Sequence, residues 1–412
     1  MNRVNELIKE YCPDGVPFQK VKDVYTRVKG TPITAGKMKE IACDNGEIRI
    51  FAGGKTIIDA HEKDIPKANI TRVPAVLVQS RGVIDVVYYD KPFTFKNEMW
   101  AYTSEDIVSV KFLYYVLKNS IQTFRDAASG MGALPQISLK VTEEFMLPVP
   151  PLEVQREIVH ILDSFTLLTA ELTAELTARK KQYNFYRDTL IQKECKSEKV
   201  KLNTICEIYD GTHQTPKYTN SGIPFVSVEN IDDLYGTQKF ISPEAYAKYK
   251  IKPRIGDVFM TRITAGIIGK CTVVDRDDDL AYYVSLALLR PNTEVLDSKY
   301  LKYYLESGWG RRELSKWILW DATPTKINKD DIGRVLISVP PLDTQKRLVQ
   351  VIEHFDTICT DLNIGLPAEI EARQKQYEYY RDLLLTFAET GSTLMTDRQT
   401  DRQTDRQTDR QS

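Results

Sequence analysis

The sequence has few of the residues that most metal and catalytic sites require. Only four histidines occur in 412 residues, and the six cysteines, at 12, 43, 195, 206, 271 and 359, form no Cys-x-x-Cys pair. A zinc site or a disulfide framework is therefore not expected. No apolar run reaches about 18 residues, the length of a transmembrane helix, and residues 1–15 lack the apolar core of a signal peptide. We expect a cytoplasmic protein that makes no contact with a membrane.

Nucleotide-binding and methyltransferase motifs are also missing. Residues 52–56 (AGGKT) and 267–271 (IIGKC) are similar to phosphate-binding loops, but the first glycine of that motif would fall on Arg49 and on Thr264. No Gly-x-Gly-x-x-Gly follows a candidate strand, and neither Pro-Pro pair follows the Asn or Asp of an amino-methyltransferase motif. These absences favour a chain that is not an enzyme and has no catalytic residues or metal of its own.

The chain also lacks a charge excess of either sign. It carries 56 Lys and Arg against 57 Asp and Glu, a net charge of −1. This balance argues against coating nucleic acid by bulk charge, so any DNA contact has to come from a local surface or from partner proteins. The length favours two domains with connecting elements.

What the sequence does contain is an internal repeat, which indicates one structural unit used twice. The matching pairs are PPLEVQ (150–155) with PPLDTQ (340–345), ARKKQYNFYRD (178–188) with ARQKQYEYYRD (372–382), and, more loosely, VKFLYYVLKN (110–119) with SKYLKYYLES (298–307). The second pair is identical at eight of eleven positions. The offset grows from 190 to 194 residues, so the second copy holds four extra residues.

Each repeated stretch has the spacing of a long helix. Apolar residues recur in steps of three and four, which is the seam of a coiled coil. In the first copy they are Val154, Ile158, Ile161, Phe165, Leu168, Leu172, Leu176, Tyr183, Tyr186 and Leu190. A lone helix cannot bury this seam, so we expect the two copies to pack against each other in antiparallel fashion. Gly365 and Pro367 should interrupt the second copy. The alternative is two unrelated amphipathic helices, each packed on its own domain.

The rest of the chain reads as strands and turns with one helical stretch per half. We therefore predict an α+β fold with two mixed α/β domains, separated by two long antiparallel helices in a pseudo-twofold repeat. The expected bounds are 1–147 for the first domain, 148–193 for the first helix, 198–337 for the second domain, 338–390 for the second helix and 391–412 for a tail.

Two short tandem repeats allow further predictions. TAELTAEL (169–176) lies inside the first helix, where one tetrapeptide adds about one turn, or roughly 6 Å. TDRQ repeated from 396 has no apolar residue, so this tail should be disordered. The tetranucleotide ACAG, read in threes, encodes Thr-Asp-Arg-Gln. We hypothesise a phase-variable C-terminus after about residue 395; scattered synonymous codons in the gene would contradict this.

The repeated helical motifs, with LPVPPLEVQ (147–155) and ISVPPLDTQ (337–345) before them, resemble the S subunits of type I restriction–modification systems. The TAEL tandem looks like the spacer repeat of one branch of that family. The resemblance covers residues 1 to about 388, and the two globules match only in outline, as target-recognition domains.

The resemblance implies a DNA sequence-specificity subunit that binds a bipartite, asymmetric site in double-stranded DNA. The helices would set the unread spacer, two modification (methyltransferase) subunits would methylate adenine, and restriction (helicase–nuclease) subunits would translocate and cleave. Such partners would carry S-adenosylmethionine, ATP and Mg²⁺, and this chain would carry no cofactor.

Base readout favours Arg, Lys, Asn, Gln, Ser or Thr on loops beside strands. The candidate DNA-binding residues are Lys55, Gln79, Ser80, Arg81, Asn97, Thr215, Lys217, Ser227, Asn230, Thr261, Arg262 and Lys270. Each could instead be an ordinary turn residue. For the helix tyrosines, Tyr183, Tyr186, Tyr377 and Tyr380, seam packing is favoured over base stacking.

Two other functions remain open at this point. One is a coiled-coil adaptor or scaffold that pairs two globules without reading DNA. The other is a self-contained DNA-modifying enzyme with diverged motifs. Gel shifts with modification subunits, and methyl transfer by the chain alone, distinguish these from a specificity subunit.

Overall fold

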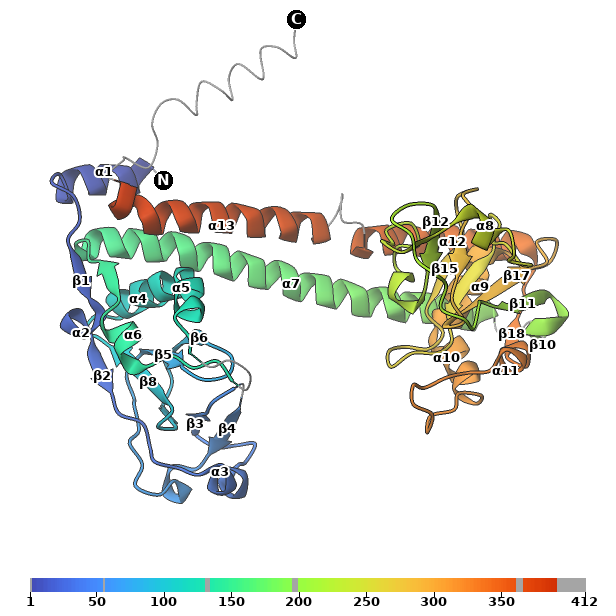
Figure 1. Ribbon diagram of the computed structural model, residues 1–412. Helices are drawn as coiled ribbons and strands as arrows, with labels where there is room; N and C mark the ends of the chain where they lie inside the picture. The colour runs from blue at the N-terminus through green and yellow to red at the C-terminus, as the bar shows by residue number, and fades with distance from the viewer. Residues whose placement is uncertain (1, 55, 130–133, 195–198, 361–365, 391–412) are drawn as a thin grey trace, which may run out of the picture. The chain divides into compact units, whose positions relative to one another are not determined.

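The computed structural model describes residues 2–54, 56–129, 134–194, 199–360 and 366–390. Its contacts divide the chain into two compact units: unit 1 comprises residues 1–171 and 371–412, and unit 2 comprises residues 172–370. Each unit therefore contains one globule and a part of both repeat copies (Figure 1). In the described part of the chain, no helix is long and apolar enough to cross a lipid bilayer.

Two sheets form the globule of unit 1. The antiparallel sheet has the order β2 (Thr26–Val28), β8 (Met99–Thr103), β5 (Ala75–Gln79), β6 (Asp85–Tyr89). In the second sheet, β3 (Ile48–Phe51) lies between β4 (Ile57–Ala60) and β7 (Phe93–Phe95), and β3 and β7 are parallel. The central β5, AVLVQ, is buried along its whole length, as expected for a β-branched strand with neighbours on both sides. A short ladder joins β1 (Phe18–Lys20) to β9 (Met146–Pro148).

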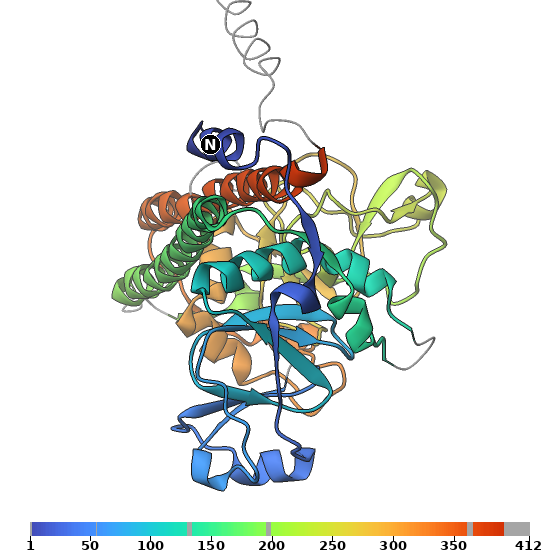
Figure 2. The same ribbon diagram turned by 90° about the vertical axis from the view of Figure 1, so that its left-hand side faces the viewer.

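Helices cover one face of the first sheet in unit 1 (Figure 2). The main one, α4 (Ile107–Asn119), begins where the Asp106 carboxylate accepts a hydrogen bond from the Val108 amide at 2.7 Å, which caps the helix. It packs on β5 and β6. The other short helices are α1 (Asn2–Tyr11), α2 (Val21–Val24), α3 (Ala35–Ile41), η1 (Glu62–Asp64), α5 (Ile121–Asp126) and α6 (Leu139–Glu143).

Unit 2 repeats this topology strand for strand. Its sheets have the orders β11 (Cys206–Asp210), β17 (Leu286–Pro291), β14 (Val258–Thr261), β15 (Cys271–Val273), and β13 (Phe240–Ile241), β12 (Ile223–Val226), β16 (Ala281–Tyr282). β10 (Lys199–Lys201) pairs with β18 (Leu336–Ser338). Asp297 caps α9 (Ser298–Glu306) as Asp106 caps α4. The remaining short helices are η2 (Leu202–Thr204), η3 (Val228–Asn230), α8 (Pro243–Tyr246), α10 (Gly308–Ser315) and α11 (Lys329–Gly333).

The repeat copies are helical, as the spacing predicts. The first copy is one helix, α7 (Leu152–Glu194), and the described part of the second copy forms α12 (Leu342–Thr360) and α13 (Leu366–Thr390). Pro367 lies in the first turn of α13, where proline is tolerated, and the interruption predicted at Gly365 stays a prediction. Residues 361–365 and the TDRQ tail lie outside the described residues.

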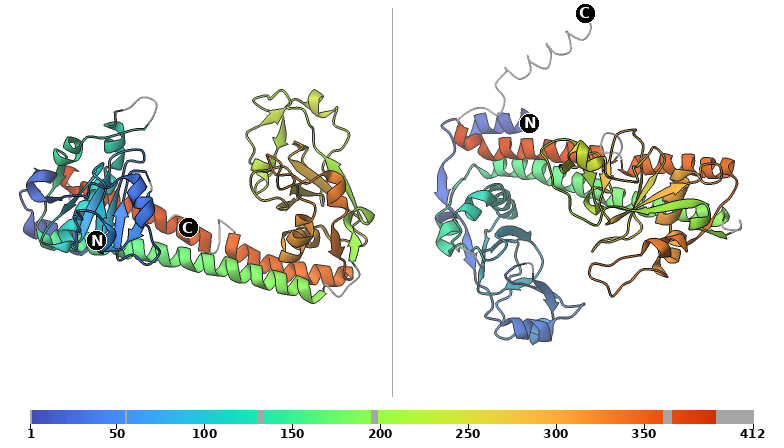
Figure 3. Two further views of the ribbon diagram at one scale, coloured as in Figure 1. Left: turned by 90° about the horizontal axis from the view of Figure 1, so that it is seen from below. Right: turned by 45° about the vertical axis from the view of Figure 1, so that its right-hand side comes forward.

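Each repeat copy ends in a closing motif, residues 178–188 in the first copy and 372–382 in the second. The first of these motifs belongs to unit 2 and the second belongs to unit 1, so each lies with the globule that precedes the other copy. In unit 1, Phe165 of α7 stacks on Tyr380 of α13, with ring centroids 5.5 Å apart. In unit 2, the repeat-equivalent residues Phe355 of α12 and Tyr186 of α7 stack at 5.8 Å. Figure 3 shows the green α7 beside the orange-red helices of the second copy. The start of each copy thus pairs with the end of the other, which confirms the antiparallel partnership and overturns the alternative of two unrelated helices. The α+β fold class is confirmed, while the linear domain bounds stay a prediction.

Candidate nucleic-acid interface

In unit 1, hydrogen bonds hold three chain segments, which we call the loop ends, together where neighbouring strands begin or end. One segment follows β3, one follows β5, and one precedes β8. The amide of Gly53 donates to Glu98 Oε1 at 3.0 Å, and Gln79 Nε2 donates to the Gly54 carbonyl at 3.0 Å. The Ser80 hydroxyl donates to the Glu98 carbonyl. Gly54 has φ +75°, a left-handed conformation that favours glycine over larger residues.

Unit 2 holds the equivalent loop ends together. By strand pairing, Ser285 corresponds to Glu98 and Val228 to Gly53. The Val228 amide donates to Ser285 Oγ at 3.1 Å, and the Arg262 amide donates to the Ser285 carbonyl at 2.9 Å. Thr261 lies where Gln79 lies in unit 1; its hydroxyl donates to the Ile267 carbonyl at 2.7 Å and accepts from the Lys270 amide at 3.0 Å.

Four of the predicted DNA-binding residues are buried at these loop ends. Gln79, Ser80, Thr261 and Arg262 are only 6, 1, 1 and 6% exposed. The Arg262 guanidinium is paired with the Asp210 carboxylate, and burial lowers the pKa of Arg262 below its usual value. These side chains position the loops, so a direct base contact would require their present hydrogen bonds to open.

The other predicted residues are more accessible. Arg81, Asn97, Thr215 and Lys217 are exposed, while Ser227, Asn230 and Lys270 are half-buried. Ser227 and Asn230 form a capping box at η3, and Lys270 makes an ion pair with Asp232 at 2.5 Å. Lys55 lies outside the described residues.

Most of these residues come together at the loop ends, but two do not. Thr215 and Lys217 lie in the separate loop between β11 and β12. Thr215 lines a hollow of about 430 Å³ in unit 2 with Tyr249, Lys248 and Lys250.

Residues that sequence reasoning missed complete this interface. Burial raises the pKa of the Glu98 carboxyl, but Lys96, 2.8 Å away, and the Gly53 amide outweigh this effect and leave it below its ordinary value. Glu98 is therefore an ionised acceptor that fixes the loop after β3. No sequence motif signals Glu98 or Ser285, because their equivalence depends on which strands pair. Sequence reasoning also missed Trp320, because its 65% exposure is visible only in the structure.

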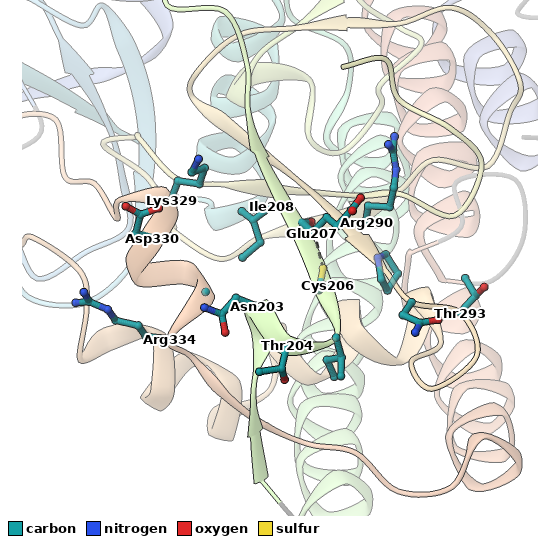
Figure 4. Close-up of a pocket in the computed structure, with 14 residues that line it drawn as sticks. Asn203, Thr204, Cys206, Glu207, Ile208, Arg290, Thr293, Lys329, Asp330 and Arg334 are labelled. Atoms are coloured by element: carbon teal, nitrogen blue, oxygen red, sulfur yellow. Dashed lines mark hydrogen bonds between the residues drawn. The ribbon is translucent and has the colours of Figure 1, made fainter. Parts of the chain in front are cut away.

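A larger hollow in unit 2, of about 870 Å³, lies away from these loop ends (Figure 4). It is lined by the beginning of β11, the end of β17 and α11, so it belongs to the opposite end of the sheet. Glu207 and Asp330 face the same space as Lys329 and Arg334, a mixture of charges that does not suit a phosphate. Within the described residues, no cluster of three or more His, Cys, Asp and Glu is placed to hold a metal.

Comparison with known proteins agrees with this duplicated architecture. The type I restriction modification DNA specificity domain matches twice, at residues 13–179 and 195–372. A putative type I restriction enzyme specificity subunit of Haemophilus influenzae is 30% identical over 310 residues, 72% of this chain and 77% of that protein. The EcoR124I/EcoR124II specificity subunit of Escherichia coli is 32% identical over 297 residues, 68% of this chain and 71% of that protein.

Solved structures show the same fold. The type I restriction–modification S subunit from M. genitalium has a TM-score of 0.52 at 16% identity, covering 93% of this chain and 97% of that chain. A chain from a type I restriction–modification system gives 0.55 at 18% identity, covering 93 and 99%. Two domain matches, two close relatives and a shared fold lead to one conclusion: the chain belongs to the family of non-catalytic DNA specificity subunits of type I restriction–modification systems.

Proposed function

We propose that this chain binds a bipartite, asymmetric DNA site, reading one half with each unit, and holds modification and restriction subunits around it in the cytoplasm. The observation that carries the proposal is the duplicated interface: Gly53 with Glu98 in unit 1 and Val228 with Ser285 in unit 2 hold equivalent loops by equivalent hydrogen bonds. Two copies of one reading surface with different side chains suit two different half-sites.

The exposed and half-buried polar residues of these loops are our candidates for base contacts. Arg81 and Asn97 in unit 1, and Asn230 and Lys270 in unit 2, carry the donors and acceptors that match base edges in the major groove. Gln79, Ser80, Thr261 and Arg262 remain part of the proposal as residues that position these loops.

The helix pairs offer a surface for the partner subunits. In unit 2, Phe185 is 66% exposed, Val351 45% and Tyr186 40%. In unit 1, Leu167 is 61% and Tyr379 48% exposed. Exposed large apolar side chains on paired helices are a feature that protein-binding surfaces use. S-adenosylmethionine, ATP and Mg²⁺ would be bound by those subunits.

Methylome sequencing tests the proposal directly. The chain is expressed with its modification subunits in a host that lacks adenine methylation. We expect methylated adenines in a split site with an unread spacer, and replacement of residues 199–337 by those of a relative should change one half only. A contiguous site, or no methylation although the complex forms, would contradict the proposal.

The spacer prediction can be tested with the same assay. Deleting Thr173–Leu176 removes about one helical turn, roughly 6 Å, and a base pair rises about 3.4 Å. We expect the spacer to shorten by about one or two base pairs while both half-sites stay the same. A control that replaces Thr173 and Glu175 by alanine keeps the length and should keep the spacing. An unchanged spacer after the deletion would overturn the measuring role of the helices.

A further inference from the structure

In unit 2, two loops next to the candidate interface form one projecting surface, which we call the tip: residues 262–270 and 316–327. They are joined by backbone hydrogen bonds, from Thr264 N to the Thr325 carbonyl at 3.0 Å and from Ile327 N to the Arg262 carbonyl at 2.9 Å. Gly269 lies so close to Leu314 of α10 that a Cβ there would stand 2.6 Å from Leu314 Cδ1. The tip therefore continues directly from Thr261 at the end of β14 and packs against α10.

The tip exposes large apolar side chains. Trp320 is 65% exposed, Ile267 58% and Leu319 43%. Single exposed apolar residues are common on protein surfaces, but three on two joined loops form a patch.

The Trp320 ring is also held in place. Its Nε1 donates to the Ser315 carbonyl at 3.4 Å, and the turn behind it is closed by a hydrogen bond from Ala322 N to the Leu319 carbonyl at 3.3 Å. The polar atom of the indole is bonded to the end of α10, while most of the Trp320 side chain faces solvent. A preordered aromatic ring loses little entropy when it stacks on a ligand.

The polar groups around Trp320 include donors and acceptors that DNA can use. Lys326 and Lys316 stand at the two ends of the loop, where they can contact phosphates; for Lys316 this requires exchange of its present ion pair with Glu313 at 2.7 Å. Exposed Asp321 can accept a hydrogen bond from a cytosine amino group. We propose that Trp320 packs directly against bases of the half-site that unit 2 reads, as a stacking or wedge residue. This inference rests on the proposed function and names a specificity residue within it.

The corresponding loop of unit 1 has a different composition. The bridge between Leu319 and Lys326 matches one between Ser129 and Gln136, and the sequence from 129 to 136, SGMGALPQ, has no aromatic residue. An aromatic residue in this loop is therefore particular to unit 2, and replacing Trp320 should weaken binding to the half-site of unit 2 only.

The test measures DNA binding by the chain assembled with its modification subunits. The probes are a duplex with the methylome-derived site and a duplex with the unit 2 half-site scrambled. We expect W320A and W320Q to bind the first duplex about tenfold more weakly or worse, with no change on the second, while W320F retains most of the affinity. The control is I255A, since Ile255 is equally exposed (61%) but precedes β14 at the other end of the sheet.

The outcomes separate this inference from the proposed function. Wild-type affinity of W320A and W320Q for the first duplex, or equal loss on both duplexes, overturns the role of Trp320 and leaves site reading intact. Loss of the modification subunits from folded W320A would show that the tip binds protein instead, which also overturns it. If the wild-type complex does not distinguish the two duplexes, the proposed function itself fails.

Discussion

Unit 1 and unit 2 have the same strand pairings, yet different side chains hold their loops. Glu98 offers a carboxylate where Ser285 offers a hydroxyl. After β5, Ser80 donates to a carbonyl, whereas Arg262, at the equivalent position after β14, makes a buried ion pair. The backbone thus defines where these loops start and end, and side chains at those ends can change without altering the sheet. Under the proposed function, this would allow the two units to contact different DNA sequences with the same strand arrangement.

The largest effect should come from the equivalent core residues Phe112 of α4 and Tyr300 of α9, both fully buried. Replacing either by alanine should cost about 3–5 kcal/mol of unfolding free energy. Because each residue belongs to the core of its own unit, hydrogen exchange should speed up only in that unit. Loss of protection in both units at once would show that the chain unfolds as one body and would break the comparison.

A second prediction concerns the loop ends themselves. D210A leaves the Arg262 guanidinium buried without its partner and should destabilise unit 2 by about 3 kcal/mol. In unit 1, S80A removes one hydroxyl and should cost about 1 kcal/mol. Urea denaturation measures both. The double variant D210A/R262M should recover part of the loss; if it is no more stable than D210A, the ion pair is not the cause.

A third prediction compares ion pairs that join the long helices to the globules. Lys111 binds Asp163 at 2.5 Å in unit 1, and the equivalent Lys299 binds Glu353 at 2.6 Å in unit 2. Asp163 also accepts a hydrogen bond from the buried Tyr115 hydroxyl at 2.7 Å. D163A should therefore cost about 1–2 kcal/mol, and E353A less than about 1 kcal/mol. Equal losses in thermal unfolding would contradict this ranking, and adding Y115F should reduce the cost of D163A.

The smallest effect is a pH dependence of opposite sign in the two units. Burial raises the pKa of Glu306 in unit 2 above its ordinary 4.5, against the lowering influence of Lys302 and of the Cys271 amide. Its ionised form therefore costs stability at pH 7, and this cost disappears as the pH falls through the raised pKa. E306Q should melt at a higher temperature than the wild type at pH 7, and the difference should vanish below pH 4.5.

Glu47 in unit 1 provides the matched control. The Glu62 amide and His61 lower the pKa of Glu47 to about 2, so its charge adds stability above pH 4.5 that is lost as the pH falls toward 2. E47Q should melt below the wild type at pH 7. Calorimetry between pH 7 and pH 4 measures both variants, and shifts of the same sign would refute the assignment of these charges.

Sequence reasoning was most successful where the pattern is local and repeated. The heptad-like spacing predicted α7, while the interruption predicted at Gly365 and Pro367 stays a prediction because residues 361–365 lie outside the described part of the chain. The tyrosines of the closing motifs were expected in the seam, and Tyr380 and Tyr186 stack there on Phe165 and Phe355. The spacing that predicts these features is local, although the rings that stack come from different repeat copies.

The loop ends could be predicted only in outline, because they depend on contacts distant in sequence. Arg262 looks the same in the sequence whether it faces DNA or binds Asp210, 52 residues away. Gln79 likewise ends a strand, but its side-chain amide donates to the Gly54 carbonyl in the loop that follows β3 of the other sheet. Which polar residue stays exposed is decided by strand order, and this order is not encoded in any local motif.

The exchange of closing motifs has a consequence for damage to the chain. A protein cut after residue 370 keeps every residue of unit 2, yet α7 loses Tyr380 and the buried Leu384 as partners in unit 1. Truncation near the carboxyl end would therefore destabilise the unit that contains the amino-terminal globule. The tetrapeptide tract starts at Thr396, beyond the end of α13 at Thr390. A change in the length of the tract therefore leaves α13 and its contacts in unit 1 unchanged.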